Sequence, residues 1–132
     1  MQQQILTLCE FASEVNPGSL IIYKTFDVIE AKSFPWRANF YAVAKVNVSE
    51  HDTLDFKKVK MMILSAEDKN EILFTAEKDF IKEKNLEKMN FIAGFTGLKF
   101  FHSGVYLYRI TLDETIIVDY RFQVIQFSPS HI

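Results

Sequence analysis

Residues 105–127 read VYLYRITLDETIIVDYRFQVIQF, and this stretch decides the fold class. In its first half, Tyr106, Tyr108, Ile110 and Leu112 share a face. In its second half, Ile116, Val118, Tyr120, Phe122 and Val124 occupy one face and Thr115, Asp119, Arg121 and Gln123 the other, with Ile117 and Ile125 as exceptions. Alternation with a period of two is typical of half-buried β-strands. Because only Asp113-Glu114-Thr115 joins the two halves, we predict a β-hairpin.

Six further segments have strand composition and are bounded by turn residues. The predicted strands cover residues 4–13, 20–30, 38–48, 56–66, 71–79 and 89–101. Eight strands with short gaps predict an all-β fold: a two-sheet antiparallel β-sandwich, or a jelly-roll-like pair of sheets, in one domain over residues 1–132. The segment from Phe80 to Asn90 breaks the alternation. We expect a crossover loop there rather than a helical turn or two, so the fold has at most one short helix.

The charge balance argues against several kinds of partner. The chain has 15 Lys and Arg against 17 Asp and Glu, so it lacks the basic footprint of nucleic-acid-binding proteins and a polybasic membrane patch. The start Met1-Gln2-Gln3-Gln4 does not resemble a signal peptide, and the apolar runs are much shorter than a membrane-spanning helix. Its single cysteine, Cys9, favours a reducing compartment. We expect a cytoplasmic protein that binds neither nucleic acid nor membrane.

Two predicted strand segments are apolar on both faces, residues 20–23 (LIIY) and residues 61–64 (MMIL). A sandwich strand normally has one solvated face, so two dry faces imply a second cover. The segment from Phe80 to Asn90, a long loop or another subunit could supply it. Additional burial within the monomer is the simpler explanation, and self-association or a protein partner is the alternative.

The stretch GSLIIYKTFDVI at residues 18–29 follows LCEFA at residues 8–12 and precedes SFP at residues 33–35. With GVY at residues 104–106 and the hairpin after it, these motifs resemble a bacterial family of short all-β proteins known only as a domain of unknown function. Its members share a Gly-x-Leu strand, a Phe-Asp-x-Ile motif and a Phe-Pro pair. They usually have a Gly two residues before the Phe-Asp pair, where this chain has Lys24. The resemblance implies a fold and no activity, because it offers no catalytic or binding residues to transfer.

No residue pattern points to catalysis, a metal or a cofactor. Cys9 has no histidine at a meaningful spacing, and its apolar neighbours indicate a buried structural thiol. His51, His102 and His131 are far apart and lack the short spacing of zinc ligands. The acids of the predicted loops are too few per loop for a calcium site; they are Asp52, Asp55, Glu67, Asp68, Asp113 and Glu114.

Asp27 stands inside a predicted strand, where a carboxylate is disfavoured. It lies either on a solvated face or in a buried pair, for which Lys24, Arg37 and Lys45 are conceivable partners. We expect a structural hydrogen-bonding role rather than a catalytic one, because no feature nominates the second carboxylate that acid–base chemistry needs.

The best candidate binding site is Phe34-Pro35-Trp36-Arg37, which lies between two predicted strands and contains the only Trp. Trp and Arg are enriched among interface hot spots, so Phe34, Trp36 and Arg37 are candidate binding residues. The alternative is that Phe34 and Trp36 fold back and cap one end of the core.

These observations favour a non-catalytic protein-binding or scaffold module. The alternative is a β-sandwich that binds a small ligand or a carbohydrate by aromatic stacking, and an enzyme is the least favoured interpretation. An exposed ring beside polar groups would favour the small ligand, whereas a flat apolar patch would favour a protein partner.

Overall fold

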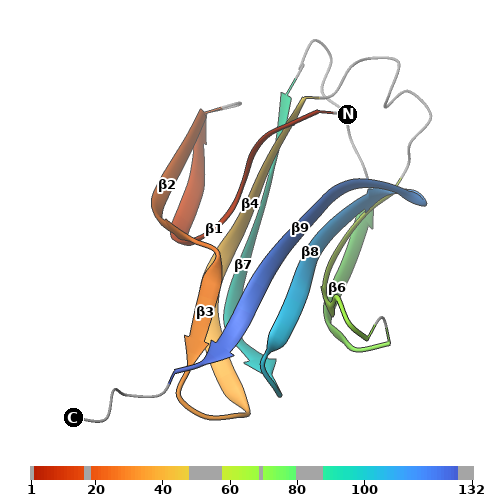
Figure 1. Ribbon diagram of the computed structural model, residues 1–132. Coiled ribbons are helices and arrows are strands. Elements are labelled where there is room, and N and C mark those ends of the chain that lie inside the picture. Colours follow the sequence, from red (N-terminus) through yellow and green to blue (C-terminus); the bar gives the residue numbers. More distant parts are fainter. Residues whose placement is uncertain (1, 17–18, 48–57, 69, 80–87, 128–132) are drawn as a thin grey trace.

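The computed structural model describes residues 2–16, 19–47, 58–68, 70–79 and 88–127, and they form nine strands in two sheets (Figure 1). The strands are β1 (Gln2–Asn16), β2 (Ser19–Phe26), β3 (Val28–Ala31), β4 (Trp36–Asn47), β5 (Lys58–Ser65), β6 (Ile72–Asp79), β7 (Lys88–Phe100), β8 (Gly104–Leu112) and β9 (Thr115–Gln126). The predicted all-β, sandwich-like fold is confirmed. The predicted crossover of residues 80–90 lies outside the described residues, except that residues 88–90 begin β7.

Sheet A has the strand order β2-β1-β4-β7, and sheet B has the order β3-β9-β8-β5-β6. The predicted C-terminal hairpin is the pair β8–β9, which joins Leu112 to Thr115 across the turn at Asp113, where φ is 53°. Among the described strands, β3 and β9 are the one parallel pair, a departure from the expected antiparallel pairing.

The main core lies between the two sheets and is rich in aromatic rings. Phe40 of β4 packs against Phe95 with ring centroids 5.0 Å apart, and Phe100 packs edge-on against Tyr106 at 5.0 Å. Phe122 of β9 contacts both Phe100 and Tyr106. Rings from both sheets therefore interlock in the middle of the sandwich, as the alternating patterns of β8 and β9 predicted.

A bulge in β9 corrects one detail of that pattern. The register of β8 and β9 shifts between Ile110 and Thr111, so that Ile110 faces Val118 and Thr111 faces Ile116. Ile117 is the extra residue, and it is buried, whereas Ile116, which was predicted to face the core, is 50% exposed. One inserted residue reverses the faces of a strand, which explains why Ile117 was an exception to the alternation.

The predicted strand over residues 20–30 is two strands, so the fold has nine strands rather than eight. The chain leaves sheet A after Phe26 and joins sheet B at Val28, with Asp27 at the corner. Asp27 is exposed, and its backbone carbonyl accepts a hydrogen bond from the Gln123 amide at 3.1 Å, where β3 begins to pair with β9. This hydrogen bond links Asp27 to the neighbouring strand β9, and it is made by the backbone carbonyl of Asp27 rather than by its carboxylate.

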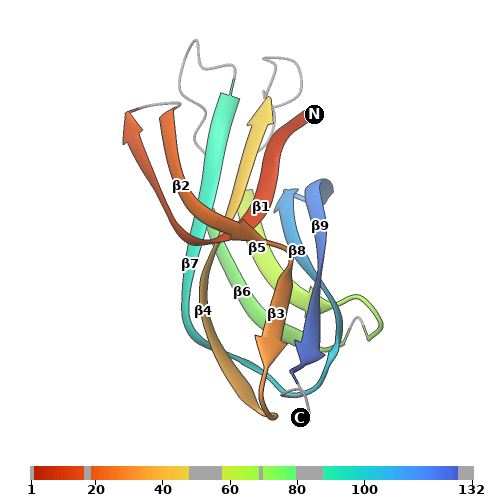
Figure 2. The ribbon, with the colours of Figure 1, turned by 60° about the vertical axis from the view of Figure 1, so that its left-hand side comes forward.

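A hairpin from the same chain covers the outer face of sheet A. Strand β1 pairs with β4 as far as Cys9, opposite Tyr41, and then curves away and pairs only with β2 (Figure 2). The returning hairpin forms a third layer beside the two sheets (Figure 1). Between hairpin and sheet lies a second apolar cluster, here called the hairpin cluster; its buried members are Cys9, Ala12 and Val43, and the partly buried ones are Ile5, Leu20, Ile22, Tyr41 and Ile92.

Of the two segments expected to be dry on both faces, the one in β2 departs from that expectation and the one in β5 agrees with it. In β2, Leu20 and Ile22 face sheet A, but Ile21 and Tyr23 are 52% and 56% exposed. In β5, Ile63 and Leu64 are both buried although they point to opposite faces. The β2 segment therefore has one packed face and one exposed apolar face, whereas in β5 the chain itself buries both faces at Ile63 and Leu64, as the simpler explanation expected.

Candidate functional site

An open hollow of about 450 Å³ lies at one side of the sandwich, here called the edge hollow. Its lining residues come from the bend of β1, from β2 and β3, and from the start of β4. They are Glu10, Phe26, Val28, Ile29, Glu30, Trp36, Arg37, Ala38, Asn39 and Phe40.

The edge hollow runs along two strand edges. Five consecutive residues of β4 (36–40) and three of β3 (28–30) line it. Consecutive side chains of a strand point to opposite faces, so a surface that touches every residue in turn follows the edge of the strand. Both edges are open among the described strands, because β1 leaves β4 beyond Tyr41 and β3 pairs only with β9.

Two of the three predicted binding residues line this hollow. Trp36 is the first residue of β4 and lies opposite Phe100 of β7, and Arg37 follows it with an exposed side chain. Phe34 is not among the lining residues. Phe34 and Trp36 are partly buried and pack against the main core, as the capping alternative supposed, while Trp36 also lines the hollow. Their role in binding stays a prediction.

Charged and polar groups share the lining of the edge hollow with Trp36. Glu10, Glu30 and Arg37 line the same hollow, and the Glu10 carboxylate lies 3.9 Å from the Lys24 ammonium, with both side chains more than half exposed. Asn39 is held in place because its Oδ1 accepts a hydrogen bond from the Gly97 amide at 2.7 Å. Gly97 has φ of +68°, which suits the bulge that β7 makes opposite β4.

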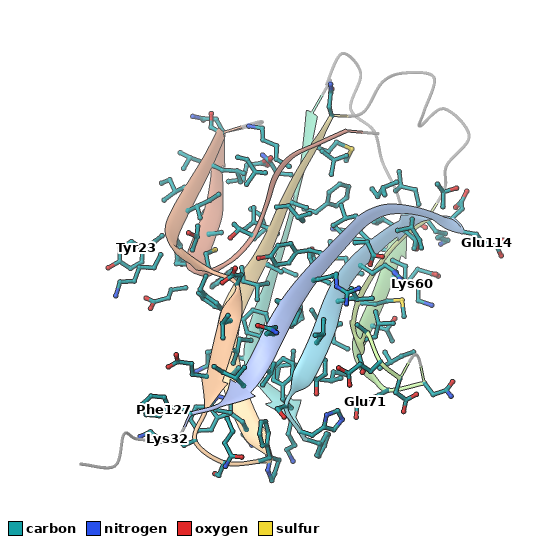
Figure 3. All side chains as sticks on the ribbon, in the orientation of Figure 1. Tyr23, Lys32, Lys60, Glu71, Glu114 and Phe127 are labelled. Carbon is teal, nitrogen blue, oxygen red and sulfur yellow. The ribbon has the colours of Figure 1, made fainter. Side chains whose placement is uncertain are left out.

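A second surface, here called the outer hairpin face, was only partly anticipated. It consists of Phe11, Val15, Ile21 and Tyr23, which are 45%, 57%, 52% and 56% exposed. Tyr23 projects from the hairpin away from both sheets (Figure 3). The sequence singled out residues 20–23 as apolar but not Phe11 or Val15. Phe11 and Val15 are four residues apart in one strand and therefore share a face, and this spacing was the available signal.

Cys9 is fully buried in the hairpin cluster, as predicted. Its thiol donates to the carbonyl of Phe11 at 3.3 Å. Burial raises the pKa of the Cys9 thiol, which opposes formation of the reactive thiolate. The residue therefore acts as a small apolar side chain.

His102 lies in the connection between β7 and β8 and is the described one of the three histidines; His51 and His131 lie outside the described residues. Its Nε2 is 2.7 Å from the Glu71 carboxylate and its Nδ1 is 3.0 Å from the Ser103 carbonyl. These two acceptors, the carbonyl foremost, raise the pKa of His102. Beside it, burial and the nearby carboxylates of Glu71 and Glu67 raise the pKa of Tyr106 to about 12.

Two described acids of the predicted turns, Asp68 and Asp113, accept hydrogen bonds from backbone amides. Asp68 Oδ1 accepts from the Asn70 amide at 3.0 Å, and Asp113 Oδ1 accepts from the Lys58 amide at 2.9 Å. Asp52 and Asp55 lie outside the described residues. Over the described stretches of the chain, no group of three or more His, Cys, Asp or Glu side chains is arranged to hold a metal ion. The same residues contain no helix with the length and apolarity needed to cross a membrane.

Fold and surfaces together define a small all-β, sandwich-like protein with an edge hollow and an apolar outer hairpin. The chain belongs to the Family of unknown function (DUF6941), whose model matches residues 4–125. The predicted resemblance to a family of unknown function is thereby confirmed. No curated protein matched the chain.

Proposed function

We propose that this chain is a non-catalytic protein-binding module that takes an extended segment of its partner along the edge hollow. One observation carries the proposal: β1 turns away at Glu10 and leaves the first five residues of β4 as an open edge, facing the open edge of β3. Open strand edges present unpaired backbone amides and carbonyls, and a peptide in extended conformation satisfies them by strand addition.

The dimensions fit a short segment. Five strand residues span roughly 16 Å, enough for an added strand of about five residues. Trp36 at one end would contribute apolar contact area, and Arg37 would pair with an acidic group or a backbone carbonyl of the partner. Such a segment would lie between the two sheets and would close this side of the sandwich.

The lining also supports a non-catalytic role. Its described residues include no Ser, Thr, Cys, Lys or His that could act as a nucleophile. Its two carboxylates, Glu10 and Glu30, are exposed, whereas acid–base catalysts are usually tuned by burial. The near-neutral charge balance and the single buried Cys9 support a cytoplasmic protein that binds neither nucleic acid nor membrane.

Affinity capture from the native host tests the proposal. Trp36 packs partly against the core, so Trp36→Ala would mix a loss of stability with a loss of binding. The cleaner variant is Arg37→Glu, and the matched control is Arg121→Glu, another exposed strand arginine, on β9. We expect Arg37→Glu to weaken the captured complex by about 2 kcal/mol, roughly 30-fold, and the control to leave it unchanged. Equal loss in both variants, or capture unaffected by Arg37→Glu, would contradict the site.

A second candidate function is binding of a small ligand or carbohydrate in the same hollow. The specific observation is that the Trp36 ring shares the lining with Asn39, Glu30 and Arg37, an aromatic surface beside hydrogen-bonding groups. Because Trp36 is the only tryptophan, its fluorescence reports directly on the hollow. A saturable change with mono- or oligosaccharides would favour this candidate, and a change only with the captured partner would favour strand addition.

A further inference from the structure

The open stretch of β4 is the place where a straight β1 would have continued. The register of β1 with β4 puts Cys9 opposite Tyr41, and β1 turns aside after that pair (Figure 2). In the same register, the next residues of a straight strand would lie opposite residues 40, 39, 38, 37 and 36 of β4, in that order. An extended segment that adds antiparallel to this edge therefore has five positions, each with a fixed neighbour on β4.

These five positions alternate between the two faces of sheet A. Ala38 and Phe40 are buried in the main core, and Trp36 packs against that core. Arg37 and Asn39, which lie between them, are exposed. Directly opposite neighbours share a face, so the first, third and fifth side chains of an added segment point into the hollow, and the second and fourth point outward. The third position lies opposite Ala38, whose small side chain suits a large apolar neighbour.

The fourth position lies opposite Arg37, whose charge has no acidic partner in the described part of the chain. The cross-strand neighbour of Arg37 on β7 is Lys99, so two cations stand side by side on sheet A. Among the described residues, no carboxylate lies within ion-pair distance of either cation; the Lys99 ammonium lies 5.8 Å from the centroid of the Phe101 ring. Like charges directly opposite one another destabilise a sheet, and an acidic group on the free side of Arg37 offsets that repulsion.

The two carboxylates of the edge hollow leave this preference in place. Glu10 lies 3.9 Å from the Lys24 ammonium, which offsets its charge. Glu30 follows the buried Ile29 in β3, so its side chain points to the outer side of sheet B, whereas Arg37 stands on sheet A. The fourth position therefore takes its charge preference from Arg37.

We propose that the partner of the edge hollow binds through an extended segment with the pattern apolar–polar–apolar–acidic–apolar, added antiparallel to β4 where a straight β1 would have run. This proposal rests on the function proposed above and adds the chemistry of the partner. The three apolar side chains cover Trp36, Ala38 and Phe40, and the aspartate or glutamate pairs with Arg37. Main-chain hydrogen bonds supply affinity in this mode of binding, and the alternate side chains supply specificity.

Short synthetic peptides with blocked ends test the pattern. The acidic peptide is Gly-Ser-Val-Thr-Leu-Asp-Val-Ser-Gly, and the basic peptide has Lys in place of Asp. Neither contains Trp, so the fluorescence of Trp36, the only tryptophan of the protein, reports binding. The acidic peptide should bind about tenfold more tightly than the basic one at low salt, and the difference should shrink as salt is added.

A third peptide tests register and direction. Its central part is Val-Asp-Leu-Thr-Val, which keeps the composition of the acidic peptide but moves the acid to the second position, opposite Asn39. It should lose most of the advantage of the acidic peptide, because Asn39 carries no charge and its Oδ1 is already bonded to the Gly97 amide. Equal binding of the two acidic peptides would contradict the antiparallel register.

Charge reversal in the protein guards against misfolding as the cause. Arg37→Glu should reverse the preference, so that the basic peptide binds more tightly, and a folding defect cannot produce such a reversal. Arg121→Glu, the matched control on β9, should keep the preference of the wild type. Lys99→Glu gives Arg37 an acidic cross-strand neighbour of its own and should remove most of the preference.

Several outcomes would overturn the proposal. They are equal affinity for the acidic and basic peptides, a preference that survives Arg37→Glu, and a wild type whose fluorescence none of the peptides changes. Self-association of the protein that Arg37→Glu abolishes would place a second copy in the hollow and would overturn it as well. The capture experiment judges the function separately: a native partner lost with Arg37→Glu but kept with Arg121→Glu supports strand addition, whatever the pattern of its segment.

Discussion

The outer faces of the two sheets differ in how they meet solvent. On sheet A the outward side chains of Cys9 and Val43 are fully buried, because the β1–β2 hairpin lies over them. On sheet B the outward side chains include Arg109 and Asp119, which face each other across β8 and β9. They form a bidentate ion pair, in which Arg109 Nε donates to Asp119 Oδ1 and Arg109 Nη2 donates to Asp119 Oδ2, both at 3.1 Å. The first face is dry and the second is solvated.

The difference shows what an extra layer does. Covering sheet A removes apolar surface from water there, but it moves some of that surface outward to the far side of the hairpin, where Ile21 and Tyr23 are exposed. On the outer face of sheet B, charged side chains such as Arg109 and Asp119 stand where sheet A has its apolar layer, and they share that face with the buried Leu64 and Leu107. The curve of β1 that builds the cover also bares the edge of β4, so the hairpin cluster and the edge hollow have one structural cause.

The largest expected effect comes from placing the same charge on both outer faces. Val43→Asp puts a carboxylate into the fully buried hairpin cluster and removes an apolar side chain, so it should cost about 4 kcal/mol or more of the free energy of unfolding. Thr111→Asp is the control on sheet B, where the new carboxylate would lie directly opposite Lys60. It should cost less than about 1 kcal/mol. Urea denaturation of the two variants measures both, and similar costs would contradict the comparison.

A smaller effect concerns the point at which the hairpin bends. Lys24 has φ of 54°, a left-handed conformation that costs a residue with a side chain about 1 kcal/mol. This is the position at which the sequence lacked an expected glycine, and the backbone has kept the conformation that glycine favours. Lys24→Gly should therefore stabilise the protein, by up to about 1 kcal/mol after the loss of the exposed ion pair to Glu10. Thermal unfolding measures it, and Lys24→Ala, which keeps the strain, is the control and should give no gain.

The alternation of β8 and β9 could be predicted because one face of each strand packs on the core and the other faces largely outward, so successive side chains alternate in polarity. The break at Asp27 could not be predicted, since a strand carries no local sign of which sheet it joins. The bulge at Ile117 was visible as an exception, but its meaning depended on the register with β8. In each case the missing information was a pairing between distant segments.

The same limit applies to the candidate site. Residue type and a place between two predicted strands selected Trp36 and Arg37, and both line the edge hollow. The opposite wall, formed by β3 and Glu10, is brought there by the change of sheet at Asp27 and by the curve of β1, neither of which has a local signature. Phe34 was selected for its position in the loop, and the structure packs it against the core.

The smallest expected effect is a pH dependence of stability that arises beside sheet B and not in the hairpin cluster on sheet A. The pKa of His102, beside sheet B, is raised above its ordinary value of 6.5, first by the Ser103 carbonyl and then by the Glu71 carboxylate. A group whose pKa is higher in the folded state contributes stability that is fully present below the unfolded pKa and is lost as pH rises through the folded pKa. The free energy of unfolding should therefore fall as pH rises above about 6.5, by less than about 1 kcal/mol because His102 is half exposed. His102→Gln should remove that slope, whereas Ile22→Val, in the hairpin cluster, should lower stability equally across this pH range because no charge changes there. A slope that persists in His102→Gln would assign the titration to another group.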